Sequence, residues 1–212
     1  MLNDIININK KHEAAAITIY DHIAPELKEK YIITMSGEVA SGKCEIAQVL
    51  ARIYKKDGLK VKILHMDDYY LVPPEDRTEW RKKHGIDKIG YDEYDWKRIN
   101  QNVDDFKGGL KSSLPCVDLI TSQVDELITD FKDIDILIIN GLYSIMLDKA
   151  HLRVFVELTY RETIMEQMAE QKEEMDEFRM KVLEREHEVV QSLKPLAEFY
   201  VDFDNSGEAF HL

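Results

Sequence analysis

The fold class is set by residues 31–44, which read Tyr-Ile-Ile-Thr-Met-Ser-Gly-Glu-Val-Ala-Ser-Gly-Lys-Cys. The first five of these residues form a short apolar run rich in β-branched side chains, which is typical of a buried strand. A turn bounded by Gly37 and Gly42 follows, and apolar residues then recur over residues 44–56 at the spacing of one helix face. The order of strand, glycine-bounded turn and helix indicates the opening unit of an α/β fold.

The turn carries the pattern G-x-x-x-x-G-K, and its residues are Gly37, Glu38, Val39, Ala40, Ser41, Gly42 and Lys43. In this pattern the backbone N–H groups and the start of the helix surround phosphate oxygens, while the lysine reaches the terminal phosphates. A glycine turn with a purely structural role is the alternative. The strand before the turn and the helix after it favour the phosphate-binding interpretation.

The residue after the lysine is Cys44, where this pattern normally has a Ser or Thr whose hydroxyl ligates Mg²⁺. A thiol is a soft ligand, whereas Mg²⁺ is a hard cation that prefers oxygen. We therefore place Cys44 in the predicted nucleotide site and expect weakened metal binding. Phosphate binding need not weaken, because the backbone supplies it.

The rest of the chain alternates strand-like and helix-like segments. Residues 61–65, 134–139 and 153–158 are short apolar runs that predict further buried strands, and residues 12–24 and 96–106 have the apolar spacing of helices. This alternation predicts a mainly parallel sheet with helices on its faces. Because the sequence contains no internal repeat and no Gly/Ser-rich or Pro-rich linker, we expect residues 1–212 to form a single domain.

Two segments are less regular in pattern. Residues 73–95 are polar and aromatic without a clear periodicity, so we predict irregular structure there. Residues 163–194 have a helical composition in which acidic side chains outnumber basic ones. This acidic stretch is interpreted as a solvated helical face, with an acidic binding site as the alternative.

Charge and composition exclude several classes of protein. The sequence has 28 Lys and Arg against 41 Asp and Glu, and its formal charge of −13 would repel nucleic acids and anionic membranes. The most apolar stretch, residues 134–147, is too short to span a bilayer, and residues 1–11 lack a signal-peptide pattern. With only two cysteines, Cys44 and Cys116, we expect reduced thiols and a cytoplasmic protein that binds neither nucleic acid nor membrane.

Paired carboxylates, Asp67 and Asp68, follow the second predicted strand. Ligand chemistry in open parallel sheets collects at such strand ends. A carboxylate there can accept a proton from a substrate hydroxyl or hold Mg²⁺, the tasks that phosphoryl transfer requires beyond positioning. The alternative is that either residue caps a helix or a turn.

Four segments together resemble the uridine kinase and phosphoribulokinase branch of the P-loop kinases, over about residues 31–204. The order and spacing of these segments are similar to the family pattern, and the segments are residues 37–44, His65-Met-Asp-Asp-Tyr-Tyr70, Gly90-Tyr-Asp-Glu-Tyr-Asp-Trp96 and Ile138-Ile-Asn-Gly-Leu-Tyr143. The resemblance implies a three-layer P-loop fold with a helical lid-like region at about residues 160–194. It also implies ATP and Mg²⁺ as cofactors, and transfer of the ATP γ-phosphate to a hydroxyl of a small metabolite. Members of the family are often dimers or tetramers, so a homo-oligomer is among the states to test.

The resemblance assigns roles position by position. It implies that Asp67 is the catalytic base and a metal-linked carboxylate, and that Lys43 contacts the transferred phosphate. Asp68 is the candidate for a second metal ligand. Tyr70 and Asp92 fall where the family contacts the phosphate acceptor.

The segment that lines the nucleoside site in uridine kinases departs from the family pattern. It corresponds to Pro115-Cys-Val-Asp-Leu-Ile-Thr121, with Val117 in place of a tyrosine and Ser122 in place of a histidine. These changes remove the aromatic stacking and the hydrogen bonding that would hold a pyrimidine base. Because such contacts provide much of a site's selectivity, we expect an acceptor other than uridine or cytidine.

Further departures affect catalysis. Asn140 stands where the family has a metal-supporting Glu, and the lid stretch 163–174 contains Lys172 as its single cation in place of the family's arginines. Arg179 and Arg185 lie further along, and Arg179 is the candidate for substrate binding. These losses make a catalytically impaired nucleotide-binding module the alternative to an active kinase, with a slow NTPase that has no acceptor as a third option.

Overall fold

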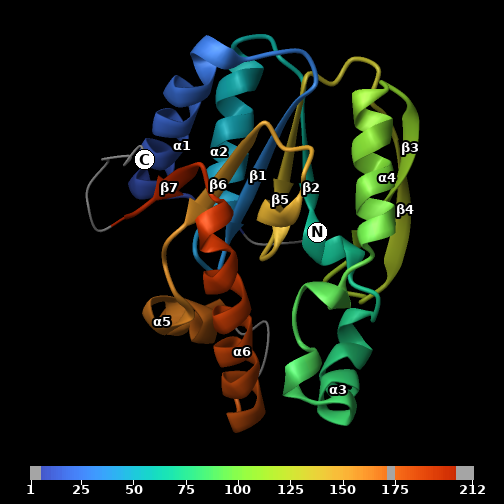
Figure 1. The fold of residues 1–212 in the computed structure, drawn as a ribbon, viewed down its shortest axis with the longest axis vertical. Coiled ribbons are helices and arrows are strands. Elements are labelled where there is room, and N and C mark those ends of the chain that lie inside the picture. The colour runs from blue at the N-terminus through green and yellow to red at the C-terminus, as the bar shows by residue number, and fades with distance from the viewer. Residues whose placement is uncertain (1–5, 171–174, 204–212) are drawn as a thin grey trace.

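The computed structural model describes residues 6–170 and 175–203, and its centre is a five-stranded parallel sheet (Figure 1). The strand order is β2-β5-β1-β6-β7, and each neighbouring pair is parallel. The bounds are Tyr31–Gly37 for β1, Val61–His65 for β2, Ile136–Asn140 for β5, Leu152–Val156 for β6 and Phe199–Val201 for β7. The predicted α/β class with a mainly parallel sheet is confirmed.

Helices cover both faces of the sheet, which gives the three layers. On one face α1 (Lys10–Ile23) and α2 (Lys43–Lys56) pack over side chains such as Ile33 and Met35 of β1. On the other face α4 (Trp96–Lys107) packs over Ile32. β1 is buried along its whole length because successive side chains enter the cores on opposite faces.

Three more helices extend beyond the carboxyl ends of the strands (Figure 1). They are α3 (Pro74–His84), α5 (Tyr160–Glu170) and α6 (Glu177–Leu193). The helical character expected for residues 163–194 is confirmed in the described part, with α5 beginning earlier than predicted. Lys172 lies outside the described residues.

Helix α3 and the hairpin of residues 111–130 differ from the expectation. Helix α3 lies within residues 73–95, which lacked a helical period because only Arg81 of its eleven residues is buried. Strands β3 (Lys111–Val117) and β4 (Val124–Asp130) form a separate antiparallel hairpin. The sequence did not predict β4, since nearly all of its residues are exposed and no alternating apolar pattern marks it.

The parallel arrangement brings the candidate residues to one edge of the sheet. The phosphate-binding loop follows β1, Asp67 follows β2 and Asn140 ends β5, so all three lie at carboxyl ends of neighbouring strands. Among the described residues, no helix is long and apolar enough to cross a membrane.

Candidate active site

The loop between β1 and α2 has the backbone shape that its glycines allow. Gly37 and Gly42 have φ values of 145° and 88°, and Ala40 between them has 56°. A Cβ atom on Gly37 would lie 2.6 Å from the carbonyl oxygen of Val156, so the close approach of β6 also requires glycine there. The loop therefore has the strand, turn and helix context that the phosphate-binding prediction required.

Lys43 is buried inside this loop. Its Nζ donates to the backbone carbonyl of Glu38 and, at 3.2 Å, to Ser41 Oγ. Burial lowers the pKa of Lys43 from its ordinary value, while the nearby carboxylates of Asp67 and Glu45 act in the opposite direction. The lysine is thus held at the loop, where it can contact a bound phosphate.

Cys44 and Asn140, the departures from the family pattern on the metal side, contact each other. Asn140 Nδ2 donates to Cys44 Sγ at 3.0 Å and lies 3.4 Å from His65 Nδ1. Burial raises the pKa of Cys44 to about 11, so the sulfur is a thiol at neutral pH. The other end of the amide, Asn140 Oδ1, is buried without a hydrogen-bond partner.

These residues do not fit a Mg²⁺ site built by the protein alone. A protonated thiol is a poor ligand for Mg²⁺, and in the described parts of the chain no three His, Cys, Asp or Glu side chains form a group that could hold a metal. Asp67 and Asp68, the predicted metal ligands, offer carboxylate oxygens after β2, and Asn140 Oδ1 lies at the end of the neighbouring β5; their role as ligands stays a prediction. A metal ion here would depend mainly on ligands from the nucleotide and water.

The two carboxylates after β2 have different surroundings. Desolvation raises the pKa of Asp67, and the charges of Arg77 and Lys43 oppose that shift. Burial likewise raises the pKa of Asp68, but its Oδ1 accepts a 2.8 Å hydrogen bond from the backbone N–H of Val117. Asp68 therefore ties the end of β2 to the hairpin, and Asp67 is the better candidate for chemistry.

Tyr70 lies in a stack of side chains near Asp67. Its ring centroid is 4.1 Å from that of Tyr94, and Cζ of the Arg77 guanidinium lies 3.5 Å from the Tyr70 centroid. Arg77 Nε is buried without a hydrogen-bond partner. Asp92, the other predicted acceptor residue, is exposed on the short 3-10 turn of residues 91–93. The structure therefore places Tyr70 and Asp92 in different surroundings, and their contact with an acceptor stays a prediction.

Arg179 belongs to a buried ion-pair network between α3 and α6. Arg81 makes a bidentate pair with Glu93 at 2.7 and 2.9 Å, and its Nη2 also donates to Glu186 Oε1 at 3.0 Å. Arg179 Nη1 is 3.8 Å from Glu186 Oε2. These contacts give Arg179 a structural role, and its predicted role in substrate binding stays untested.

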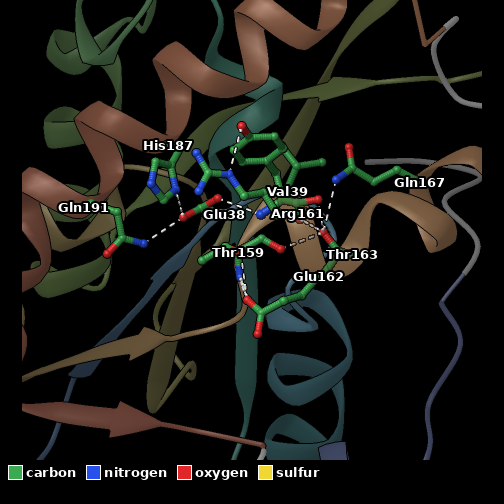
Figure 2. Close-up of polar contacts among 10 residues, drawn as sticks. Glu38, Val39, Thr159, Arg161, Glu162, Thr163, Gln167, His187 and Gln191 are labelled. Carbon is green, nitrogen blue, oxygen red and sulfur yellow. Dashed lines mark hydrogen bonds and ion pairs between the residues drawn. The ribbon is translucent and has the colours of Figure 1, made fainter.

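Glu38 joins the phosphate-binding loop to helices α5 and α6, a role that the sequence analysis missed (Figure 2). Its Oε2 accepts from the backbone N–H of Tyr160 at 2.7 Å, and its Oε1 accepts from His187 Nδ1 at 2.8 Å and Gln191 Nε2 at 2.7 Å. The available signal was a carboxylate inside a phosphate-binding loop, where negative charge needs a partner. The sequence does not reveal which residue that partner is.

The parallel sheet and the phosphate-binding loop together define a P-loop kinase fold. Comparison with known proteins agrees with this class. The model of the phosphoribulokinase / uridine kinase family matches residues 32–160. The chain therefore belongs to the phosphoribulokinase / uridine kinase family.

Curated relatives and solved structures support the same assignment. The chain is 26% identical over 137 residues to a uridine kinase of Mycoplasma genitalium, a match that spans 63% of each protein. It is 28% identical over 139 residues to a uridine kinase of Ureaplasma parvum, covering 61% of this chain and 63% of the relative. The chain thus spans under two thirds of the length of these relatives.

Two solved structures share the fold at low sequence identity. A chain described as a possible uridine kinase from Bacillus stearothermophilus has a TM-score of 0.61 at 16% identity, covering 92% of this chain and 100% of that one. Phosphoribulokinase from Rhodobacter spheroides has a TM-score of 0.59 at 15% identity, covering 87% of this chain and 76% of that one. Because the identities are this low, these structures establish the fold alone.

Proposed function

We propose that the protein is an ATP-dependent phosphotransferase that moves the γ-phosphate of ATP to a hydroxyl of a small metabolite. The observation that carries this proposal is the placement of Asp67 near the loop lysine. Asp67 follows β2 and Lys43 follows β1, and the charge of Lys43 acts on Asp67. A phosphate-binding loop with a carboxylate beside it provides the positioning and the base that phosphoryl transfer needs.

In the proposed reaction the loop amides and Lys43 hold the phosphates and stabilise charge on the moving group. Asp67 accepts the proton of the acceptor hydroxyl as its oxygen bonds to the γ-phosphorus. The bond from the γ-phosphorus to the bridging oxygen breaks, and ADP leaves. Desolvation raises the pKa of Asp67, which suits a carboxylate that must accept a proton.

The acceptor in this proposal is a hydroxylated metabolite other than uridine. Val117, which stands where uridine kinases have a tyrosine, is 2% exposed, and its backbone N–H is bonded to Asp68. A short buried aliphatic side chain cannot stack on a pyrimidine base as an aromatic ring does. The relatives named as uridine kinases therefore support the reaction class for this chain more strongly than the substrate.

We further propose that residues 1–212 work as one cytoplasmic kinase domain, with residues 160–194 as its lid. The contacts of Glu38 with α5 and α6 support this view, because they attach the lid to the nucleotide loop. A homo-oligomer remains a proposal that sedimentation velocity would test.

The first experiment is a calorimetric titration with ATP, with and without Mg²⁺, using Lys43→Ala as the control for the loop. Binding that strengthens with Mg²⁺ and is lost in the variant supports the kinase. A screen of hydroxylated acceptors, including uridine and cytidine, then measures phosphoryl transfer. A protein that binds ATP but stays inert on every acceptor contradicts the proposal.

The second candidate function is a nucleotide-binding module without transfer activity. The contact between Cys44 Sγ and Asn140 Nδ2 favours it, because both residues replace oxygen ligands of the metal. The double variant Cys44→Ser with Asn140→Glu tests this candidate. Transfer activity that appears only in the double variant supports the module, and activity already present in the unmodified protein excludes it.

A further inference from the structure

We propose that Glu38 and His187 are positioning residues that hold the lid on the phosphate-binding loop and keep the loop carboxylate turned away from bound phosphate. This inference rests on the proposed nucleotide site. It adds a role for Glu38 and His187 that neither the family's sequence pattern nor the similar proteins indicate.

The first support is the complete hydrogen bonding of a buried carboxylate. Glu38 is 2% exposed, and both of its oxygens accept hydrogen bonds from the lid (Figure 2). Because a carboxylate only accepts, the contact with His187 Nδ1 makes that nitrogen the donor. Gln191 donates to the same oxygen as His187. The donors come from both α5 and α6, so this one side chain anchors both lid helices.

A second attachment involves the next residue of the loop. Thr163 Oγ1 donates to the carbonyl oxygen of Val39 at 3.1 Å, and Gln167 Nε2 donates to Thr163 Oγ1 at 3.1 Å. The carbonyl of Glu38 in turn accepts from Lys43 Nζ. Consecutive loop residues are therefore linked to the lid through their side chain or backbone, and the lysine is linked to the same segment.

Charge explains why this arrangement matters for a nucleotide. An unpartnered carboxylate in a loop that binds phosphate would repel the ligand. The charged or titratable groups that face Glu38 are Lys43 of the loop, Arg161 of α5 and His187 of α6. The His187 ring also packs edge-on against Tyr160 at a centroid distance of 5.6 Å, which fixes its direction. Removing His187 would leave Glu38 with fewer donors and freer to turn toward the phosphates.

A set of three variants tests the proposal through ATP affinity, measured by calorimetry on the full chain. His187→Ala should weaken ATP binding by about tenfold to a hundredfold, the range expected for loss of one charge-assisted hydrogen bond. The double variant Glu38→Gln with His187→Ala should restore affinity to within about threefold, because the repelling charge is gone. His84→Ala, an exposed histidine of α3, is the matched control and should bind ATP as the unmodified protein does.

The double variant separates positioning from a merely structural role, since a structural defect would worsen when a second buried partner is changed. An affinity for His187→Ala equal to that of His84→Ala overturns the proposal. So does a double variant that binds no better than His187→Ala.

A second readout does not depend on nucleotide binding. Hydrogen exchange on the nucleotide-free protein should show faster exchange of the backbone amides of α5 and α6 in Glu38→Ala than in Glu184→Gln, an exposed change on α6. Unchanged exchange overturns the proposal. If lid exchange accelerates but the unmodified protein binds no ATP, the attachment of the lid stands and the proposed nucleotide function fails.

Discussion

Replacing Arg81 with Met should destabilise the protein strongly through the network that joins α3 to α6. Arg81 and Glu93 have side chains 6% and 5% exposed and form a bidentate pair. Glu186, 5% exposed, is bound by the same guanidinium. Arg81→Met leaves the buried carboxylates of Glu93 and Glu186 without the guanidinium that pairs with them. Removing one partner of such a buried pair lowers the free energy of unfolding by about 3–5 kcal/mol. For a chain of this length that corresponds to a fall in Tm of roughly 6–20 °C.

Thermal unfolding followed by circular dichroism measures this effect. Lys82→Met is the matched control, because Lys82 is adjacent on α3 and its pair with Glu79 is exposed. Exposed pairs contribute about 0–1 kcal/mol, so the control should lower Tm by at most about 4 °C. The triple variant Arg81→Met, Glu93→Gln and Glu186→Gln should recover part of the loss, because the two carboxylates that Arg81 neutralised are then uncharged. Equal Tm values for Arg81→Met and Lys82→Met would refute the reasoning.

Three further predictions concern the site residues. In the native protein, Cys116 should react with iodoacetamide at least about tenfold faster than Cys44 at neutral pH. The reason is that burial raises the pKa of Cys44 to about 11, so little of its thiolate is present. Peptide mass spectrometry measures the two rates. Asp67→Asn should reduce phosphoryl transfer by about 10²–10⁴-fold while ATP affinity stays within about threefold, and a small effect on turnover would exclude Asp67 as the base. Asp68→Ala should instead lower the free energy of unfolding by about 1.5–3 kcal/mol through the lost bond to the N–H of Val117, and denaturant unfolding would show it.

The centre of the sheet could be predicted from the sequence because β1 and β5 are buried along their whole length and form continuous apolar runs. Residues 134–139 were predicted as a strand, and β5 occupies Ile136–Asn140 with every residue buried. Strand β4 escaped prediction for the opposite reason, since its exposed residues carry no apolar period. Helix α3 escaped because a buried arginine, and not an apolar stripe, joins it to the rest of the protein.

The residues of the candidate site also differ in whether the sequence could locate them. The glycines, Lys43 and Asp67 could be located from a local motif and a strand end, because short-range spacing fixes their place in the fold. The partners of Glu38 could not, since His187 lies 149 residues further along the chain. The contact between Cys44 and Asn140 spans 96 residues. Such pairs depend on the order of the strands and on the position of α6 relative to the loop, and the local sequence pattern predicts neither.

The hydrogen bonds of Glu38 and Cys44 bear on whether the site can bind a ligand. Both carboxylate oxygens of Glu38 accept hydrogen bonds from α5 and α6, and Cys44 accepts a hydrogen bond from Asn140. Because an unsatisfied buried polar group costs stability, these hydrogen bonds stabilise the region of the loop whether or not it holds a ligand. Asn140 Oδ1 is the exception, because it is buried without a partner at the carboxyl end of β5, beside the loop that would hold the phosphates. This oxygen is available to a ligand held by the loop, so the residues at positions 44 and 140 are compatible with a site that binds phosphate.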